Sequence, residues 1–381
     1  MGSCVAKTSR SQPIELTVID PSSTEPLRKV LTMCRRPDPI TAITGLTTSQ
    51  DGEESRGILM LSNLSLWLGG ALSTAKERQF EEKKVTKKGD NIPADFLKEL
   101  GVAATCKKGL KPESPNQDDY CVAVHDSALI LGVFDGHGPA GHEVSAFVSL
   151  ALPQALTSRD TLRQNPASTV LTGFQQTQNE LSASMVEGKR NFNCIYSGTT
   201  ATLAVLTRNR LILGHVGDSR AVLCRVDSAT RVPTAIPLTL DHKPSVPSER
   251  ERIEASYGEI RTLEGDKAFR VFFPGKDYPG LSISRALGDV MTQSLGIQAT
   301  PDICQREIED TDEFLLICSD GVWEFISNEE AVALVWSYGQ EKVREAAEEL
   351  AKLAWKSWIH NEEGIVDDIT VLIAYFRSNV D

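Results

Sequence analysis

From about residue 100 onward the chain is a series of short apolar runs separated by turns, and this pattern restricts the folds open to it. Runs of this length, bounded by turn residues, predict β-strands. Several connections are only a few residues long, such as Arg208 to Arg210. Such connections favour antiparallel hairpins over crossover units. We expect strands at 120–125, 128–135, 200–207, 211–217, 220–226, 313–319 and 369–376.

Five other stretches carry apolar residues at helical spacing. In the last two, Leu334 and Val335, and then Leu350, Leu353 and Ala354, fall at intervals that place them on one side of a helix. We expect such helices to cover one face of a sheet. Strand runs followed by helix runs predict an α+β fold. The helices are expected at 141–156, 168–186, 248–256, 328–338 and 340–358.

The first 95 residues have a different character. They are rich in Ser, Thr, Pro and charge, and their apolar spacing is irregular. We therefore interpret residues 1–95 as a largely flexible extension and place the folded domain at 96–377. Within the extension, charges that alternate in sign predict a short solvated helix at 76–90. The apolar stretch 57–72 is interrupted by Ser and Asn and is shorter than the ~20 apolar residues that a membrane helix needs. We therefore interpret it as a packing or amphipathic segment.

The charge of the chain is unevenly distributed. The formal net charge is −12, with 14 Lys or Arg against 13 Asp or Glu in the first 100 residues and 26 against 39 in the rest. An acidic folded part argues against nucleic acid as a partner and suits a protein that binds cations. The eight cysteines include no CxxC pair. We expect reduced thiols in a cytoplasmic protein rather than disulfides or a zinc site.

Carboxylates flank the predicted strands. Asp135, Asp218 and Asp320 directly follow apolar runs, and the pairs 118–119 and 367–368 directly precede them. If these groups meet at one rim, they repel one another unless cations lie between them, and Mg²⁺ and Mn²⁺ prefer such oxygen ligands. A single Asp after a strand is more often a turn or cap residue. Three of these Asp residues have a neighbouring glycine, however, which lets a carbonyl turn inward.

An acidic rim of this kind predicts hydrolysis of phosphate esters. Two divalent ions that share one carboxylate can lower the pKa of a bridging water and present hydroxide for in-line attack on phosphorus. The leaving alkoxide then needs a proton. His137 lies two residues after Asp135 and has a suitable pKa for this role. We interpret His142 as part of a helix start and His242 as a loop residue near the site.

Seven motifs occur in the order DGHG (135–138), SGTTA (197–201), GDSR (217–220), DHKP (241–244), LSISRALGD (281–289), ICSDGVWE (317–324) and VDDITVLI (366–373). In this order they resemble the metal-dependent protein serine/threonine phosphatases of the type 2C (PPM) family. The resemblance spans about residues 100–376. It implies a four-layer αββα sandwich, in which two central antiparallel sheets are flanked by helices and two metal ions lie at one edge.

The resemblance also implies roles for individual residues. Asp135 matches the ligand that bridges the two ions, and Gly136 matches a ligand that uses its carbonyl oxygen. Asp320 and Asp367 match ligands of the first ion. His137 matches the general acid.

Three further residues match positions in the family motifs. Asp118 resembles the acid that holds metal-bound water near the second ion. Asp218, together with Asp320, resembles the pair that can hold a weak third ion. Thr200 in SGTTA is expected to be structural.

Two departures from the family pattern concern the same rim. Gln117 stands where the family often has Glu, and an amide cannot supply a carboxylate's charge, so the second ion should bind more weakly. Lys111 stands near the position of a phosphate-binding arginine; a lysine can neutralise phosphate but lacks the bidentate fork. An ordinary surface lysine is the alternative interpretation of Lys111. The long polar span 241–280 resembles the flap beside the family's cleft, and we expect its aromatic residues to pack it down.

The amino terminus, MGSCVAKTSR, resembles a lipidation signal. Gly2 suits myristoylation after removal of Met1, although Ala6 occupies the position that usually holds Ser or Thr. A second acyl chain on Cys4, with Lys7 and Arg10 nearby, would anchor the protein stably to a membrane. We hypothesise dual acylation, which would attach a cytoplasmic protein to the cytoplasmic face of a membrane. An ordinary disordered start is the alternative.

The sequence therefore predicts a phosphatase that hydrolyses phosphoserine and phosphothreonine in proteins with two Mg²⁺ or Mn²⁺ ions, and with a weak third ion. The competing hypothesis is a pseudophosphatase that binds phosphoproteins as a scaffold without turnover. The implied first-ion ligands and the general acid are all present, which favours the enzyme. We expect phosphoprotein partners, no nucleic acid, and a monomer, because the sequence contains no coiled-coil pattern.

Overall fold

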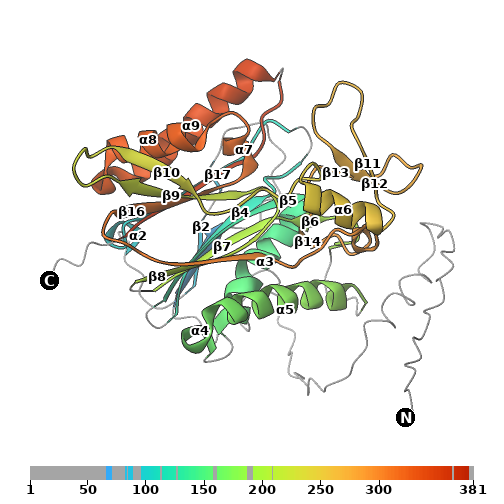
Figure 1. Cartoon of the computed structure of the whole chain (residues 1–381), viewed down its shortest axis with the longest axis horizontal. Helices are drawn as coiled ribbons and strands as arrows, with labels where there is room; N and C mark the ends of the chain where they lie inside the picture. Colours follow the sequence, from blue (N-terminus) through green and yellow to red (C-terminus); the bar gives the residue numbers. More distant parts are fainter. Residues whose placement is uncertain are drawn as a thin grey trace, which may run out of the picture. The chain divides into compact units, whose positions relative to one another are not determined.

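The computed structural model shows two antiparallel sheets packed face to face, with helices on the outer face of each (Figure 1). The helices α3 and α5 cover the first sheet, and α8 and α9 cover the second. This arrangement confirms the predicted α+β sandwich. The structure describes residues 66–70, 82–83, 85–88, 96–111, 114–125, 128–157, 161–186, 192–207, 209–362 and 364–376.

The first sheet has the strand order β15-β8-β7-β5-β4-β1-β2 in the described part of the chain. The short strands β6 and β14 extend it beside β5, and all of its pairs are antiparallel. Its strands are β1 (Leu66–Gly70), β2 (Val85–Lys88), β4 (Asp118–His125), β5 (Ala128–His137), β6 (Gly198–Thr199), β7 (Ala201–Leu206), β8 (Arg210–Val216), β14 (Leu287–Gly288) and β15 (Asp302–Glu307).

The second sheet has the strand order β10-β9-β16-β17-β3, again antiparallel throughout. Its strands are β3 (Val102–Lys107), β9 (Arg220–Val226), β10 (Pro233–Pro237), β16 (Asp312–Cys318) and β17 (Ile369–Tyr375). The helices that pack on the two sheets are α3 (Gly141–Thr157), α4 (Thr161–Gln164), α5 (Pro166–Val186), α7 (Asp320–Trp323), α8 (Asn328–Tyr338) and α9 (Val343–Asn361). Three further short helices are α2 (Phe96–Glu99), η2 (Thr292–Leu295) and η3 (Gln340–Lys342).

Alternating apolar side chains hold the four layers together. On β16, Leu315 and Ile317 pack between the two sheets, whereas Phe314 and Leu316 pack against the helices on the outer face. Successive strand residues point to opposite faces, so an unbroken apolar run can fill both layers at once. All four side chains are fully buried. Each contributes about 1.5–3 kcal/mol to stability, which fixes the positions of the strand ends.

Every strand and helix predicted from the apolar runs is present, with ends that agree to within three residues. The stretch 57–72 contributes β1, in which Trp67 and Leu68 are buried, as expected for a packing segment. Residues 85–88 form β2, so the solvated helix predicted at 76–90 is wrong there.

The strands β1 and β2 both lie before residue 96, where we expected the folded domain to start, and the domain boundaries stay a prediction. Gly2 and Cys4 lie outside the described residues. None of the described helices has the length and apolar character needed to cross a membrane. The cysteines in the described part of the chain form no disulfide.

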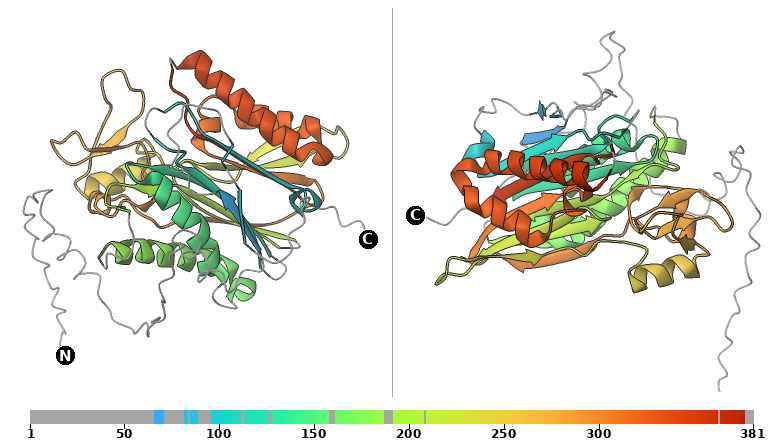
Figure 2. Two further views of the ribbon diagram at one scale, coloured as in Figure 1. Left: turned by 180° about the vertical axis from the view of Figure 1, so that it is seen from behind. Right: turned by 90° about the horizontal axis from the view of Figure 1, so that it is seen from above.

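The span 241–280 contributes a small subdomain beside the sandwich (Figure 2). It contains α6 (Pro247–Ala255) and a sheet of β11 (Glu259–Arg261), β12 (Arg270–Phe272) and β13 (Pro279–Leu281). Ile253 and Val271 of this span form one core with Leu295 and Ile297 of the segment that follows it. Phe272 is buried, as predicted for the flap aromatics, whereas Phe269 and Tyr278 remain about 40% exposed.

A buried carboxylate ties this subdomain to the sandwich. Glu249 of α6 is 2% exposed and bonds Arg285 at 2.7 Å and Arg252 at 2.8 Å. Arg285 also reaches Asp302 on β15, at 2.7 Å. Burial opposes ionisation of Glu249, but the hydrogen bonds from Arg252, Arg285 and Ser284 outweigh it and lower the pKa of this carboxyl well below its usual range.

We expect Glu249→Gln to destabilise the protein at pH 7 by about 3 kcal/mol, because two half-buried arginines would lose their buried anionic partner. The stabilisation from the carboxylate is complete above the pKa of Glu in the unfolded chain, about 4.3, and is lost as the pH falls from there towards the depressed folded pKa. The difference in unfolding free energy between wild type and variant should therefore narrow below about pH 4. Urea unfolding at several pH values measures it, and a constant difference would contradict the ionised state of Glu249.

Candidate functional site

The predicted carboxylates come together at one rim of the sandwich. Asp118 and Asp135 lie opposite each other on β4 and β5 of the first sheet. Asp320 begins α7 directly after β16, and Asp367 lies two residues before β17, the neighbour of β16 in the second sheet. The charges of Asp118, Asp320 and Asp367 all act on Asp135. The rim is therefore built from strand ends of both sheets.

Burial and mutual repulsion disfavour the ionised forms of these groups. Burial raises the pKa of Asp135 well above its usual range, and the charges of Asp118, Asp320 and Asp367 raise it further. Burial also raises the pKa values of Asp118 and Asp320. An added cation would relieve this repulsion and favour ionised carboxylates.

Two lysines lie among the carboxylates. Lys111 forms an ion pair with Asp367, and Lys243 forms one with Asp218. Burial acts to lower the pKa values of both lysines, but the surrounding carboxylates outweigh it and raise them. As the side chains stand, no three His, Cys, Asp or Glu groups in the described residues converge on one point to hold an ion. The positive charge at the rim comes from the two ammonium groups instead.

The chemistry of the rim nevertheless fits hard divalent cations. Oδ1 of Asp118 and Oδ1 of Asp320 are buried and have no hydrogen-bond partner. The other oxygen of Asp118 accepts hydrogen bonds from Ser319 Oγ and Thr370 Oγ1, both at 2.7 Å. Buried carboxylate oxygens without a partner are costly, and Mg²⁺ and Mn²⁺ bind such oxygens. The assignment of each ligand stays a prediction.

The backbone around Asp135 is held tightly. Thr200 Oγ1 accepts a hydrogen bond from the Asp135 amide at 3.0 Å, and the Thr200 amide donates to the Asp135 carbonyl at 2.8 Å. These bonds agree with a structural role for Thr200. A Cβ atom at Gly136 would lie 2.3 Å from the carbonyl oxygen of Gly141, so only glycine fits there. Asp135 and the Gly136 carbonyl are thus fixed at the end of β5.

Asp368 orders the segments around the rim, a role that the sequence did not suggest although the motif VDDITVLI contains this residue. Its carboxylate accepts hydrogen bonds from the amides of Gly109 at 2.7 Å and Gln117 at 2.8 Å. The Gln117 side chain in turn donates from Nε2 to the Gly138 carbonyl at 2.7 Å. A glutamate could not donate this bond. Gln117 therefore holds the loop that follows β5.

His137 also has a partner that the sequence did not reveal. Its Nε2 lies 2.6 Å from Oδ2 of Asp289, which is 1% exposed and has a φ of +45°. Burial alone would lower the pKa of His137, but the charge and hydrogen bond of Asp289 outweigh it and raise the pKa. Asp289 ends the motif LSISRALGD, to which we assigned no chemical role. The pair joins residues 152 positions apart, a separation that hides it from inspection of the sequence.

His142 and His242 lie where the sequence analysis predicted them. His142 lies in the first turn of α3. His242 lies in the loop after β10, where its Nδ1 accepts a hydrogen bond from the Gly217 amide at 3.1 Å. Its ring stacks on His215, with ring centres 4.6 Å apart. His242 thus helps to fix the turn that carries Asp218.

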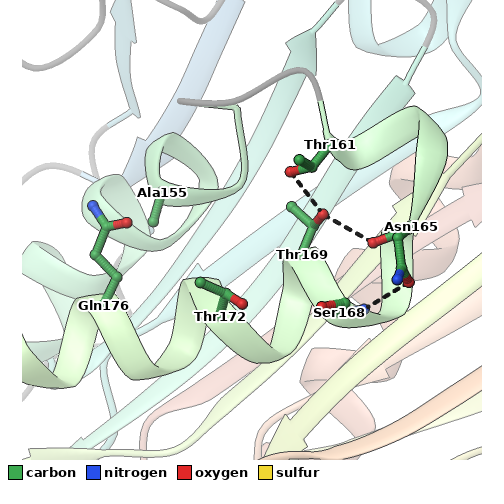
Figure 3. Close-up of a pocket in the computed structure, with 7 residues that line it drawn as sticks. All are labelled: Ala155, Thr161, Asn165, Ser168, Thr169, Thr172 and Gln176. Carbon is green, nitrogen blue, oxygen red and sulfur yellow. Dashed lines mark hydrogen bonds between the residues drawn. The ribbon is translucent and has the colours of Figure 1, made fainter.

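A separate pocket of about 230 Å³ lies beside α4 and α5 (Figure 3). Thr169 Oγ1 lies 3.0 Å from Thr161 Oγ1 and donates to the Asn165 carbonyl at 2.9 Å. The lining contains no charged side chain and none of the predicted site residues, so the acidic rim remains the candidate site. The lining residues are Ala155, Thr161, Asn165, Ser168, Thr169, Thr172 and Gln176.

Comparison with known proteins points to the family suggested by the motifs. The model of the family described as "Protein phosphatase 2C" matches residues 108–362. "Probable protein phosphatase 2C 73" of Oryza sativa subsp. japonica is 34% identical over 341 residues, which cover 81% of this chain and 80% of that protein. "Probable protein phosphatase 2C 72" of Arabidopsis thaliana is 36% identical over 263 residues, which cover 65% of this chain and 77% of that protein.

Solved structures show a similar fold. The serine-threonine phosphatase 2C from Toxoplasma gondii superposes with a TM-score of 0.61 at 21% identity, covering 72% of this chain and 94% of that chain. A sex determining protein of C. elegans superposes with a TM-score of 0.60 at 23% identity, covering 72% of this chain and 64% of that chain. At these identities the two structures support the sandwich fold and nothing finer.

Proposed function

Because the chain belongs to the protein phosphatase 2C family and is therefore a protein serine/threonine phosphatase, we propose that it hydrolyses phosphoserine and phosphothreonine at the acidic rim with two Mg²⁺ or Mn²⁺ ions. The observation that carries this proposal is the group of buried and half-buried carboxylates at the rim. Asp118, Asp135 and Asp320 repel one another there, and two of them have buried oxygens without hydrogen-bond partners.

In this proposal, Asp135 would serve both ions and the Gly136 carbonyl would be a further ligand. Asp320 and Asp367 would bind the first ion, and Asp118 would hold water near the second. When bound, the two cations neutralise the phosphate and lower the pKa of water at the rim. The rigid end of β5 fixes the direction in which Asp135 and Gly136 face the substrate.

Lys111 and Lys243 affect the balance of charge at the rim in this proposal. Once cations offset Asp367, the Lys111 ammonium is available to neutralise the phosphate of the substrate, without the orienting fork of an arginine. Lys243 already pairs with Asp218. A third ion held by Asp218 and Asp320 would have to compete with this ammonium group and would therefore bind weakly.

His137 supplies the proton in this mechanism. Asp289 accepts a hydrogen bond from Nε2 and favours the protonated ring. With Nε2 engaged, Nδ1 is the atom that would give its proton to the leaving serine or threonine oxygen. Asp289 thus orients the ring and stabilises its charge, much as a carboxylate does for other catalytic histidines.

The scaffold hypothesis rested on the two departures from the family pattern. Gln117 has a local role that a glutamate carboxylate could not perform, because its amide donates to the Gly138 carbonyl. Lys111 points into the rim, where it pairs with Asp367. Both departures are compatible with turnover, and we favour the active enzyme.

The purified chain should release phosphate from a phosphothreonine peptide when Mn²⁺ is present and stop when the ion is chelated. Asp320→Asn should lower the rate by more than about 100-fold. Loss of a residue that only orients a ligand costs about 10–100-fold, and this variant removes a proposed ligand itself. The variant should keep its fold, since it relieves repulsion at the rim; thermal unfolding without Mn²⁺ provides this control. A scaffold would release no phosphate above the metal-free background.

His137→Ala should reduce the rate about 10²–10⁴-fold for a phosphoserine peptide and far less for a nitrophenyl phosphate, whose leaving group needs no proton. Asp289→Asn should show the same dependence on the leaving group with a smaller loss, because the ring keeps a neighbour but loses the anion. Steady-state kinetics with both substrates measure this. Equal losses for the two substrates would show that His137 is not the general acid.

Acylation of Gly2 and Cys4 remains a proposal that rests on the terminal sequence alone. Two acyl chains would bind a membrane stably, whereas one binds marginally. In cell fractionation, wild type should partition into membranes and Gly2→Ala should not. Cys4→Ser should give an intermediate result, and equal partition of all three proteins would rule out lipid anchoring through this terminus.

A further inference from the structure

A buried lysine reaches the rim from outside the segment that matches the family. Glu82 and Lys83, which we call the strap, lie shortly before β2, whereas the family model begins at residue 108. Lys83 is 5% exposed. Its ammonium donates to the main-chain carbonyl of Asp118 and lies 3.4 Å from Oδ2 of Asp119. A residue of the amino-terminal region therefore contacts the first two residues of β4.

The strap also binds the edge of the second sheet. The Lys83 amide donates to the Cys106 carbonyl on β3 at 2.8 Å. Glu82 accepts from the Cys106 amide at 3.0 Å and from Thr105 Oγ1 at 2.6 Å. Because β3 belongs to the second sheet and β4 to the first, the strap connects the two sheets at the start of β4. This is the end of β4 that carries Asp118.

Lys83 also compensates a buried charge. Asp119 is fully buried, and its Oδ1 accepts hydrogen bonds from the amides of Gly70 at 2.9 Å and Tyr120 at 2.7 Å. Oδ2 of Asp119 has no hydrogen-bond partner, and Lys83 is the cation beside it. Without that ammonium group, an uncompensated carboxylate would remain next to Asp118, and the start of β4 would have to rearrange.

We propose that the strap is a positioning element of the catalytic rim, in which Lys83 fixes the start of β4 so that Asp118 faces Asp135. The inference rests on the proposed cation-dependent function. Partners that orient a metal site from outside the ligand shell typically change metal affinity 10–100-fold when they are removed. The strap would act in this way although it lies outside the matched family segment.

The test compares full-length wild type with the double variant Lys83→Met and Asp119→Asn. Replacing both partners leaves no buried unpaired charge, so the variant should fold, and it keeps the net charge of the protein. We expect Mn²⁺ affinity measured by calorimetry to fall about 10–100-fold. The kcat at saturating Mn²⁺ should fall as well, while KM for the phosphopeptide changes little, because the strap does not touch the substrate.

Leu350→Ala serves as the matched control, because Leu350 is fully buried between α9 and the second sheet. This variant should unfold at a lower temperature and keep wild-type Mn²⁺ affinity. If the double variant binds Mn²⁺ as tightly as wild type, or loses affinity only to the extent that Leu350→Ala does, the inference is overturned. If wild type itself takes up no Mn²⁺, the proposed function fails first and the positioning role fails with it.

Discussion

Repulsion between carboxylates that the fold forces together at one edge is the constraint on which the rest of the structure depends. Asp135 is the centre of this group, because Asp118, Asp320 and Asp367 all act on it. The chain offsets the repulsion with ammonium groups and hydrogen bonds rather than by separating the acids. A polypeptide would not retain such an arrangement for stability alone, since neutral residues of similar size would pack at lower cost. The unfavourable electrostatics point to a function that uses them.

The sandwich supplies the rigidity that this arrangement requires. Each sheet buries both of its faces, one against the other sheet and one against helices, so neither sheet can shift without disturbing two layers. Asp118 and Asp135 come from neighbouring strands of one sheet, whereas Asp320 and Asp367 flank neighbouring strands of the other. The geometry of the rim therefore depends on how the two sheets are aligned. The strap formed by Glu82 and Lys83 contacts both sheets beside Asp118.

Local patterns predicted the central strands of both sheets and the long helices that cover them, because an apolar run that fills two layers is visible in the sequence. The same patterns missed β3 and the partly exposed strands such as β15, whose mostly polar sequence DICQRE contains no apolar run. The grouping of carboxylates at one rim was predictable because the acids directly follow or precede apolar runs. The partners Asp289, Asp368 and Lys83 were not, because each acts across a contact between segments far apart in the chain. Periodicity carries no information about such pairs.

The register between β4 and β5 limits how this protein can change over evolution. Asp118 and Asp135 meet because the register pairs each residue of β4 with one residue of β5. A single-residue insertion within either strand would turn every following side chain to the other face and bury a carboxylate in the apolar layer. Length variation should therefore accumulate in distant connections, such as the exposed turn at 227–232. The strands beside the rim can accept substitutions but not insertions or deletions.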